Sequence, residues 1–130
     1  ACAFAADVSD TQAMHAVAAE IRAQFGDVHL LCNNAGIAGL HRRCWNFSDD
    51  DWQRLLDINL RGVINGLQAF LPQMVDQSEG HIVNTASMAG LIPTPMNAPY
   101  CASKFAIVGL TETLALDLRD YAALQHCSAP

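Results

Sequence analysis

The sequence has few basic residues, and this excludes two broad classes of partner. Lysine and arginine together number 7 against 13 acidic residues, which gives a formal net charge of −6. A chain of this charge has no broad attraction to nucleic-acid phosphates or to anionic membranes. The one basic pair, Arg42-Arg43, is typical of a solvated loop. We therefore expect no nucleic-acid partner and no membrane partner.

The sequence also lacks the spacings of a disulfide framework and of a metal site. Its 5 cysteines are odd in number, no two have Cys-x-x-Cys spacing, and no two histidines have ligand spacing on one helix. We expect reduced thiols, no metal and a cytoplasmic protein. No apolar run reaches membrane-spanning length, and the first residues lack the basic start of a signal peptide. Because the first residue is not methionine, we expect the chain to begin inside a longer reading frame.

The composition that is present is typical of a folded α/β domain. Of the 130 residues, 52% are hydrophobic and 15% are charged, enough for one domain with a core. Strands are predicted over residues 2–6, 28–32 and 81–86, and helices over residues 10–25, 51–71 and 99–120. Another strand is expected where residues 121–130 end. The alternation predicts a doubly wound parallel sheet, Rossmann-like and incomplete, with helices on both faces, in a single partial domain over residues 1–130.

Local signals predict where the helices begin and end. Ser9 and Gln12 have the spacing of a capping box ahead of the first helix. Ser48 and Asp51 repeat this spacing ahead of the second helix. Pro72 is expected to kink or end that helix, because proline lacks the backbone N–H that a helix interior uses.

Tyr100 and Lys104 carry the clearest chemical signal. They are four residues apart, so they share one face of a helix. An ammonium beside a phenol stabilises the phenolate, which lets the tyrosine exchange a proton with an alcohol or a carbonyl. Ser87 follows the predicted strand at residues 81–86, and its hydroxyl is suited to bonding the same substrate oxygen. The spacing alone is also typical of a half-buried tyrosine beside a solvated lysine.

Three further places have both a structural and a functional interpretation. The run Asn33–Gly36 (Asn-Asn-Ala-Gly) either lets the backbone approach a ligand or is simply a strand-to-loop turn. Asp7 is either an ordinary strand-end carboxylate or a ligand contact. Asn59 stands in mid-helix on the face of Trp52 and Leu55, where a buried amide needs hydrogen-bond partners.

In this order, the motifs resemble the short-chain dehydrogenase/reductase family of the non-extended type. The resemblance runs from Asp7 to about Arg119. It implies hydride transfer between NAD or NADP and a small alcohol or ketone, in a protein that is a homo-oligomer when complete. In the family the helix-borne asparagine holds a water in a proton relay that ends at the lysine. The implied catalytic residues are Asn59, Ser87, Tyr100 and Lys104.

The resemblance also implies contacts with the cofactor. Asp7 would bond the adenine amino group, and Val8 would pack beside the ring. The Asn-Asn-Ala-Gly run would brace the sheet and line the adenosine ribose, while the lysine would hold the nicotinamide ribose. The implied cofactor-binding residues are Asp7, Val8, Asn33, Ala35, Gly36, Tyr100 and Lys104.

The chain departs from the family pattern at both ends. It lacks the glycine-rich turn that holds the pyrophosphate, the strand that sorts NAD from NADP, and the strand after Arg119. Two absent strands would separate the strand ending at Asp7 from the one at residues 28–32. Two interpretations stay open: the catalytic segment of an oxidoreductase, or a catalytically inactive truncated copy of one. An extended-type sugar-nucleotide epimerase shares Tyr-x-x-x-Lys, but the Asn-Asn-Ala-Gly run argues against it.

Overall fold

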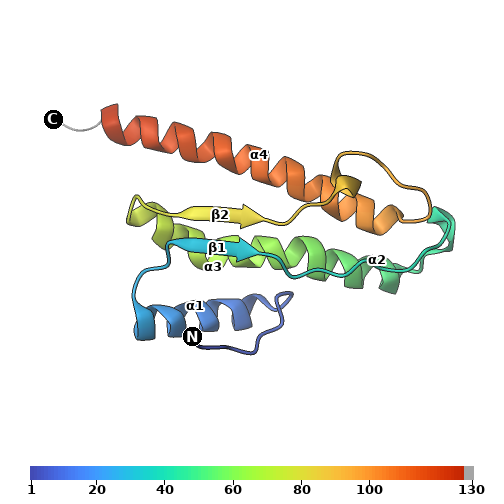
Figure 1. Ribbon diagram of the computed structural model, residues 1–130, viewed down its shortest axis with the longest axis horizontal. Coiled ribbons are helices and arrows are strands. Elements are labelled where there is room, and N and C mark those ends of the chain that lie inside the picture. The colour runs from blue at the N-terminus through green and yellow to red at the C-terminus, as the bar shows by residue number, and fades with distance from the viewer. Residues whose placement is uncertain (128–130) are drawn as a thin grey trace.

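The chain forms four α-helices and two strands over the residues that the structure, a computed structural model, describes, 1–127 (Figure 1). The first half holds α1 (Thr11–Phe25), β1 (Leu30–Asn33), a 3₁₀ turn (Cys44–Asn46) and α2 (Asp49–Leu56). A π-helical turn (Asp57–Arg61) joins α2 to α3 (Gly62–Asp76). The second half holds β2 (His81–Asn84), a 3₁₀ turn (Met88–Gly90) and the long helix α4 (Ala98–Cys127).

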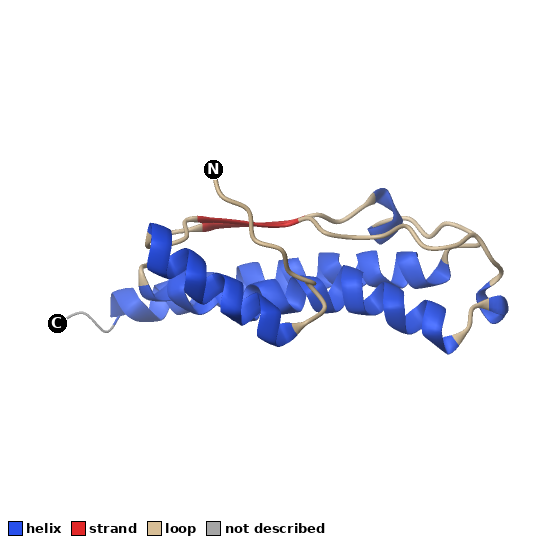
Figure 2. Cartoon of the chain, turned by 90° about the horizontal axis from the view of Figure 1, so that it is seen from below, coloured by secondary structure: helices blue, strands red, loops and turns tan. Residues whose placement is uncertain are grey.

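The two strands pair in parallel, as predicted, from Leu30 opposite His81 to Asn33 opposite Asn84. The first begins later than predicted, and the second ends before residue 85. The described helices all lie on one side of the strands (Figure 2), although we expected helices on both faces. The chain connects β1 to α2 and α3, and β2 to α4, on the same side of the strands, so these helices form a single layer with α1. The other sheet face therefore leaves Leu30 and Val83 exposed, as an incomplete sheet does.

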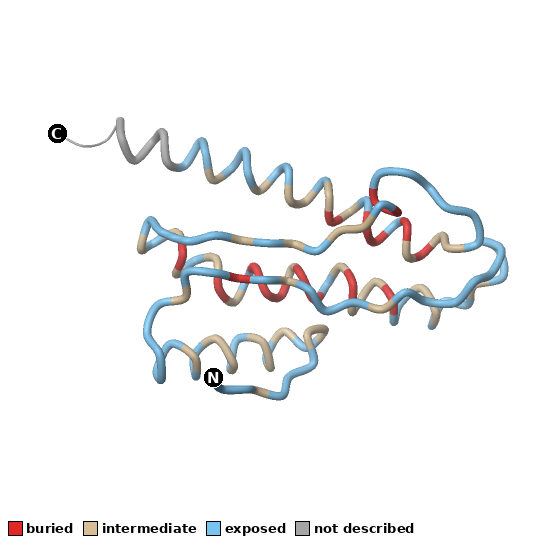
Figure 3. The backbone as a smooth tube through the Cα atoms, in the orientation of Figure 1, coloured by how far each residue is buried: buried red, intermediate tan, exposed pale blue. Residues whose placement is uncertain are grey.

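The core lies between the strands and the helices. Figure 3 shows the buried residues concentrated along α3 and the first half of α4. Helix α1 packs against this core through Met14, Ala18 and Ile21 without burying any residue fully. The central cluster consists of Leu31, Val63, Leu67, Phe70, Met74 and Ile107.

The predicted strand over residues 2–6 is wrong. The two strands of the described residues pair only with each other, and a strand without a neighbour leaves its backbone groups unpaired. The N-terminal segment is instead attached to α3 by Val8, whose carbonyl accepts a 2.8 Å hydrogen bond from Nδ2 of buried Asn65. The Val8 side chain lies so close to Gly62 that a Cβ there would come within 2.8 Å of it.

One predicted helix cap is wrong and the other is confirmed. The carboxylate of Asp10, not the hydroxyl of Ser9, caps α1 and accepts the backbone N–H of Gln12 at 2.8 Å. A carboxylate is the stronger acceptor for these amides. At α2 the predicted capping box is present, because Ser48 accepts the N–H of Asp51 and Asp51 accepts the N–H of Ser48.

Two helices continue past their predicted ends. Pro72 lies inside α3, which runs to Asp76, so proline does not end this helix. Proline removes the hydrogen bond to the carbonyl of Gln68, which is an exposed residue of this helix. Helix α4 continues to Cys127 through residues we expected to lead into a strand, because alanine, leucine and glutamine there favour helix. None of the described helices is long and apolar enough to cross a membrane.

The Ser48 cap gives a first testable prediction. We expect Ser48→Ala to lower the free energy of unfolding by about 1 kcal/mol, because the N–H of Asp51 loses its acceptor. Urea unfolding measures this change. Thr113→Ala, at an exposed position within α4, is the matched control and should leave stability nearly unchanged. Equal losses in the two variants would show that the cap does not stabilise α2.

Candidate active site

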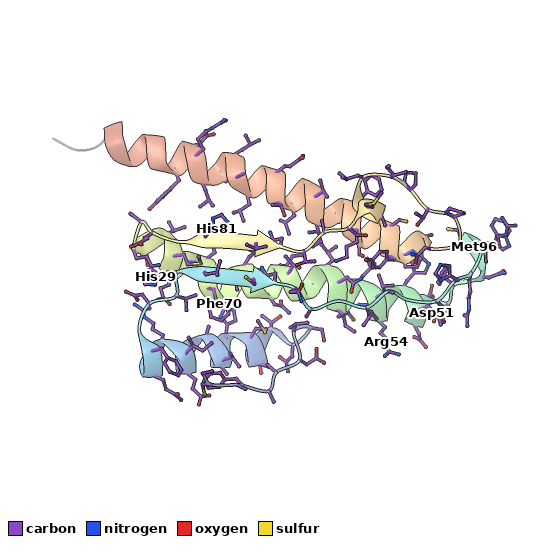
Figure 4. All side chains as sticks on the ribbon, viewed as in Figure 1. His29, Asp51, Arg54, Phe70, His81 and Met96 are labelled. Carbon is purple, nitrogen blue, oxygen red and sulfur yellow. The ribbon has the colours of Figure 1, made fainter. Side chains whose placement is uncertain are left out.

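The candidate residues gather at the carboxyl ends of β1 and β2, where ligands bind in open α/β sheets. The chain leaves β1 into the loop 34–43 and leaves β2 into the segment 85–97. The backbone N–H of Thr85 donates to the Asn33 carbonyl at 3.0 Å, which fixes the two exits beside each other. In Figure 4 Met96 and Asp51 mark this end of the molecule, and His29 and His81 mark the opposite end.

Lys104 is the buried cation of the site. Only 6% of it is exposed, and its Nζ donates a 2.7 Å hydrogen bond to the Thr85 carbonyl. The same nitrogen lies 5.8 Å from the centroid of the Tyr100 ring. An ammonium has three N–H donors, and the described residues use one of them in a hydrogen bond. The remaining donors are therefore available to a ligand at this end of the sheet.

Asn59 lies in the π-helical turn, and its side chain joins the loop after β1 to α4. It is 1% exposed, which confirms the predicted burial. Its Oδ1 accepts the Ile37 N–H at 2.7 Å, and its Nδ2 donates to the Ile37 carbonyl at 2.8 Å and to Ser103 Oγ at 3.3 Å. Ser103 Oγ in turn donates to the Tyr100 carbonyl at 2.7 Å. Single π turns inside helices are frequent at functional sites.

Gly36 is the point at which these groups meet. A Cβ at Gly36 would lie 3.2 Å from Asn59 Oδ1 and 3.8 Å from Lys104 Nζ. Residues that are far apart in the sequence, on a loop and two helices, are thus brought within a few ångströms of one another. A bare backbone at Gly36 keeps this space open to a ligand.

Ser87 and Tyr100 are not hydrogen-bonded to each other in the described residues. Ser87 caps the 3₁₀ turn that follows it, with Oγ accepting the Ala89 N–H at 3.2 Å. That turn packs tightly on α4, since a Cβ at Gly90 would come within 2.6 Å of the Lys104 carbonyl. Tyr100 is half-buried on the first turn of α4. A ligand oxygen between the two hydroxyls would complete their hydrogen bonding.

The predicted cofactor residues fall into two groups. Asn33 braces the sheet: its Nδ2 donates to Asn84 Oδ1 at 2.9 Å, and Asn84 Nδ2 donates to Thr111 Oγ1 on α4 at 3.0 Å. Ala35 and Gly36 are exposed beside it, as a ligand-facing loop requires. Asp7 and Val8 lie on the N-terminal segment, where the Val8 carbonyl is bonded to Asn65 of α3.

Asp7 and Asp51 have pKa values below the usual range. The hydroxyl and backbone N–H of Ser9 lower the pKa of Asp7, and the backbone N–H and hydroxyl of Ser48 lower that of Asp51. A carboxyl whose pKa is lower in the folded state stabilises the fold above its unfolded pKa. That contribution is lost as the pH falls through the folded value, so both turns weaken in acid.

Three contributing residues escaped the sequence analysis. Asn65 is fully buried and accepts the Thr11 hydroxyl at 2.9 Å as well as binding Val8. Its position in mid-helix, unfavourable for asparagine, was the same signal that singled out Asn59. Ser103 stands next to Lys104 in the sequence, yet nothing in the pattern marks it. Thr85 acts through its carbonyl, which no side-chain pattern reveals.

A groove of about 580 Å³ lies at the opposite end of the molecule. It runs between the ends of α3 and α4 and the start of β2, with Met74, Ile82 and Leu118 among its lining residues. Its lining includes none of the candidate residues. We therefore place the chemistry at the carboxyl ends of the strands and not in this groove.

Comparisons with known proteins give one matching family model and several similar proteins. The family model described as short chain dehydrogenase matches residues 1–128. The chain is 34% identical over 128 residues to the 3-oxoacyl-[acyl-carrier-protein] reductase FabG of Staphylococcus aureus, covering 98% of this chain and 52% of that one. Among solved structures, NAD⁺-bound xylitol dehydrogenase superposes with a TM-score of 0.87 at 42% identity, covering 91% of this chain and 45% of that one.

A second solved structure gives the same result. A short chain dehydrogenase/reductase from Burkholderia phymatum in complex with NAD has a TM-score of 0.85 and 47% identity, covering 88% of this chain and 41% of that one. The predicted α/β fold class is confirmed by these superpositions. The chain spans about half the length, or less, of the proteins it matches here.

Proposed function

This chain belongs to the short-chain dehydrogenase family, and on that premise we propose that it is the catalytic segment of an oxidoreductase. The reaction is hydride transfer between NAD or NADP and a small alcohol or ketone. One observation carries the proposal: the buried Lys104 ammonium lies between the Thr85 carbonyl, the Tyr100 ring, and the bare backbone of Gly36. A surface lysine on an amphipathic helix has no such surroundings.

Each of the four proposed catalytic residues has a separate task. Tyr100 gives a proton to the carbonyl oxygen in reduction and takes it back in oxidation. Ser87 donates a hydrogen bond to the same oxygen and stabilises its developing charge. Lys104 places its ammonium 5.8 Å from the centroid of the Tyr100 ring, beside the proposed proton donor. Asn59 holds the Ile37 loop in place, because both polar atoms of its amide are bonded to that backbone.

The residues present fit one half of a nicotinamide dinucleotide. The free donors of Lys104 suit ribose hydroxyls, and Gly36 leaves room for a sugar beside them. The bound cofactor supplies or accepts the hydride. The pyrophosphate of the dinucleotide fits the described residues less well. Helix α1 begins at the carboxylate of Asp10 and α2 begins with three aspartates, and these negative charges repel a pyrophosphate. Asp7 and Val8 are proposed as the adenine contacts on the basis of the family pattern alone.

We further propose a cytoplasmic homo-oligomer that acts on a small-molecule alcohol or ketone. The free thiols of Cys2, Cys32, Cys44 and Cys101 support a reducing compartment. Exposed apolar side chains on α4, among them Phe105 and Leu116, support contact with a second copy.

Lys104→Met tests the proposed function. In the natural protein that carries this sequence, we expect carbonyl-dependent oxidation of NADH or NADPH, followed by absorbance of the reduced nicotinamide. The variant should lose about 10- to 100-fold in kcat/KM and bind cofactor more weakly, because a charged hydrogen-bond donor is replaced by an apolar chain of similar length. Methionine suits this buried position, so the fold should persist.

The matched control removes a cation from the same helix. Arg119→Met changes a side chain that is 74% exposed, and its kcat/KM should stay close to that of the natural protein. Full activity of Lys104→Met would show that the lysine has no catalytic role. If the natural protein oxidises neither cofactor with any carbonyl, the inactive-copy interpretation holds instead.

A further inference from the structure

The stretch that carries two of the proposed catalytic residues has no formal charge. From residue 82 to residue 103 the sequence contains no acidic, basic or histidine side chain, although Ser87 and Tyr100 both lie within it. Histidine, aspartate, glutamate, lysine and arginine are common on loops at the mouth of a polar site. A substrate oxygen placed between these two hydroxyls therefore lies beside a long uncharged surface.

This surface exposes large apolar side chains instead. Met88, Leu91, Ile92 and Met96, here named the apolar wall, are between 43% and 76% exposed. Met88 directly follows Ser87, and Met96 lies four residues before Tyr100. Single exposed apolar residues are ordinary, but a group of four flanking a proposed reaction centre marks a binding surface.

The apolar wall is held in place by specific contacts. The Thr94 N–H and hydroxyl lie 3.4 Å and 3.1 Å from the Sγ of buried Cys101, on the helix turn of Tyr100. The Met96 carbonyl accepts the Arg42 N–H at 2.9 Å. Met96 itself has a φ of +62°, a left-handed conformation that non-glycine residues adopt only when their surroundings impose it. These contacts hold the backbone of the wall in one conformation.

The nearest arginines are already engaged. The Arg42 guanidinium is paired with Asp51 at 3.1 Å, and the Arg43 guanidinium lies 5.9 Å from the centroid of the Trp45 ring. Neither is presented as a free anchor for an anionic substrate. The same loop adds a further apolar surface, because Trp45 is exposed.

We propose that the substrate is an uncharged ketone or secondary alcohol whose apolar body lies on the apolar wall. This proposal rests on the proposed oxidoreductase function and names the substrate class of that site. The oxygen of the substrate lies between Ser87 and Tyr100, and the alkyl or ring portion contacts Leu91, Ile92 and the two methionines. Sugars and carboxylate substrates should be poorer substrates, because they would lose hydration against this wall without gaining hydrogen bonds.

A chain-length series measures the apolar contact directly. With the natural protein and its reduced cofactor, kcat/KM should rise roughly fourfold for each methylene added from propanone through butanone to methyl butyl ketone. Erythrulose, a polyhydroxy ketone with the carbon count of butanone, should be the poorer substrate of that pair. A flat series, or a preference for erythrulose, would overturn the proposed substrate class while leaving the oxidoreductase function intact. No turnover of any carbonyl would overturn both.

Leu91→Lys tests the wall itself. We expect this variant to flatten the chain-length series while its rate with propanone changes little, because propanone is too short to need the wall. Phe25→Lys likewise replaces an exposed apolar side chain with lysine, at the last residue of α1. It should keep the full dependence of kcat/KM on chain length. Loss of folded protein lowers the rate for every ketone equally, so it cannot flatten the series. An unchanged slope in Leu91→Lys would show that the apolar body lies elsewhere.

The four methionines allow a binding measurement that does not need turnover. With methyl-labelled methionine, addition of methyl butyl ketone should shift the NMR signals of Met88 and Met96. The signals of Met14 and Met74, which belong to the core, should stay in place. Shifts at the core methionines alone, or no shift at all, would show that the wall is covered by another part of the protein or by a second copy.

Discussion

Tyr100→Phe should abolish most of the activity while leaving the protein folded. The substitution removes one oxygen from a half-buried ring and leaves the ring itself in contact with Lys104. If the phenol is the proton donor, turnover should fall by about 10²- to 10⁴-fold, the usual contribution of general acid–base catalysis. Steady-state kinetics with the reduced cofactor and the best ketone of the series measure this loss.

The control for this variant lies on the same helix. Tyr121→Phe removes a phenol from an exposed tyrosine further along α4, and its turnover should resemble that of the natural protein. Binding of the cofactor to Tyr100→Phe, followed by the fluorescence of the reduced nicotinamide, should fall far less than turnover. Natural turnover in Tyr100→Phe would eliminate the tyrosine as the proton donor.

Gly66→Ala should be strongly destabilising. A Cβ at this position would overlap with Oδ1 of Asn33 and would lie 3.1 Å from its Cγ. The Asn33 amide has little room to move, because it is hydrogen-bonded to Asn84 on the neighbouring strand. Helix α3 must therefore shift away from β1, at a cost of about 1–3 kcal/mol or more in the free energy of unfolding.

Gly109→Ala is the matched control for that prediction. It adds the same methyl group to a helix at a place where no atom lies within 4 Å. It should stabilise the protein by about 0.5–1 kcal/mol, because alanine is the better helix former. Chemical denaturation of both variants gives the difference. Two variants of equal stability would mean that α3 is not packed on β1 as closely as described.

Much of the fold followed from local patterns in the sequence. The helical periodicity ahead of Gly26 predicted α1, and Gly26 ends it with a φ of +83°. The spacing of Ser48 and Asp51 predicted the start of α2. These features are decided within a few residues, so no distant contact was needed to predict them. The end of α3 was not predicted, because the helix continues through Pro72, where the residue four positions earlier, Gln68, is exposed.

The prediction of a strand over residues 2–6 was wrong for a different reason. Its composition suits a strand, but strands exist only in pairs, and the presence of a neighbour is not a property of the segment. Instead the buried amide of Asn65 bonds the Val8 carbonyl, which holds the segment against α3.

The sequence by itself singled out the residues that we propose for the chemistry, and it determined how two of them are placed relative to each other. Tyr100 and Lys104 share a helix face because they are four residues apart, and any helix at that place brings them together. Only the tertiary structure decided what surrounds them: the Thr85 carbonyl on the ammonium, and the Ile37 backbone on Asn59. These contacts join segments that are distant in the chain, and their geometry depends on how α3 and α4 pack beneath two strands. Local sequence specifies which residues share a helix face, whereas the packing of the whole chain specifies which groups that face contacts.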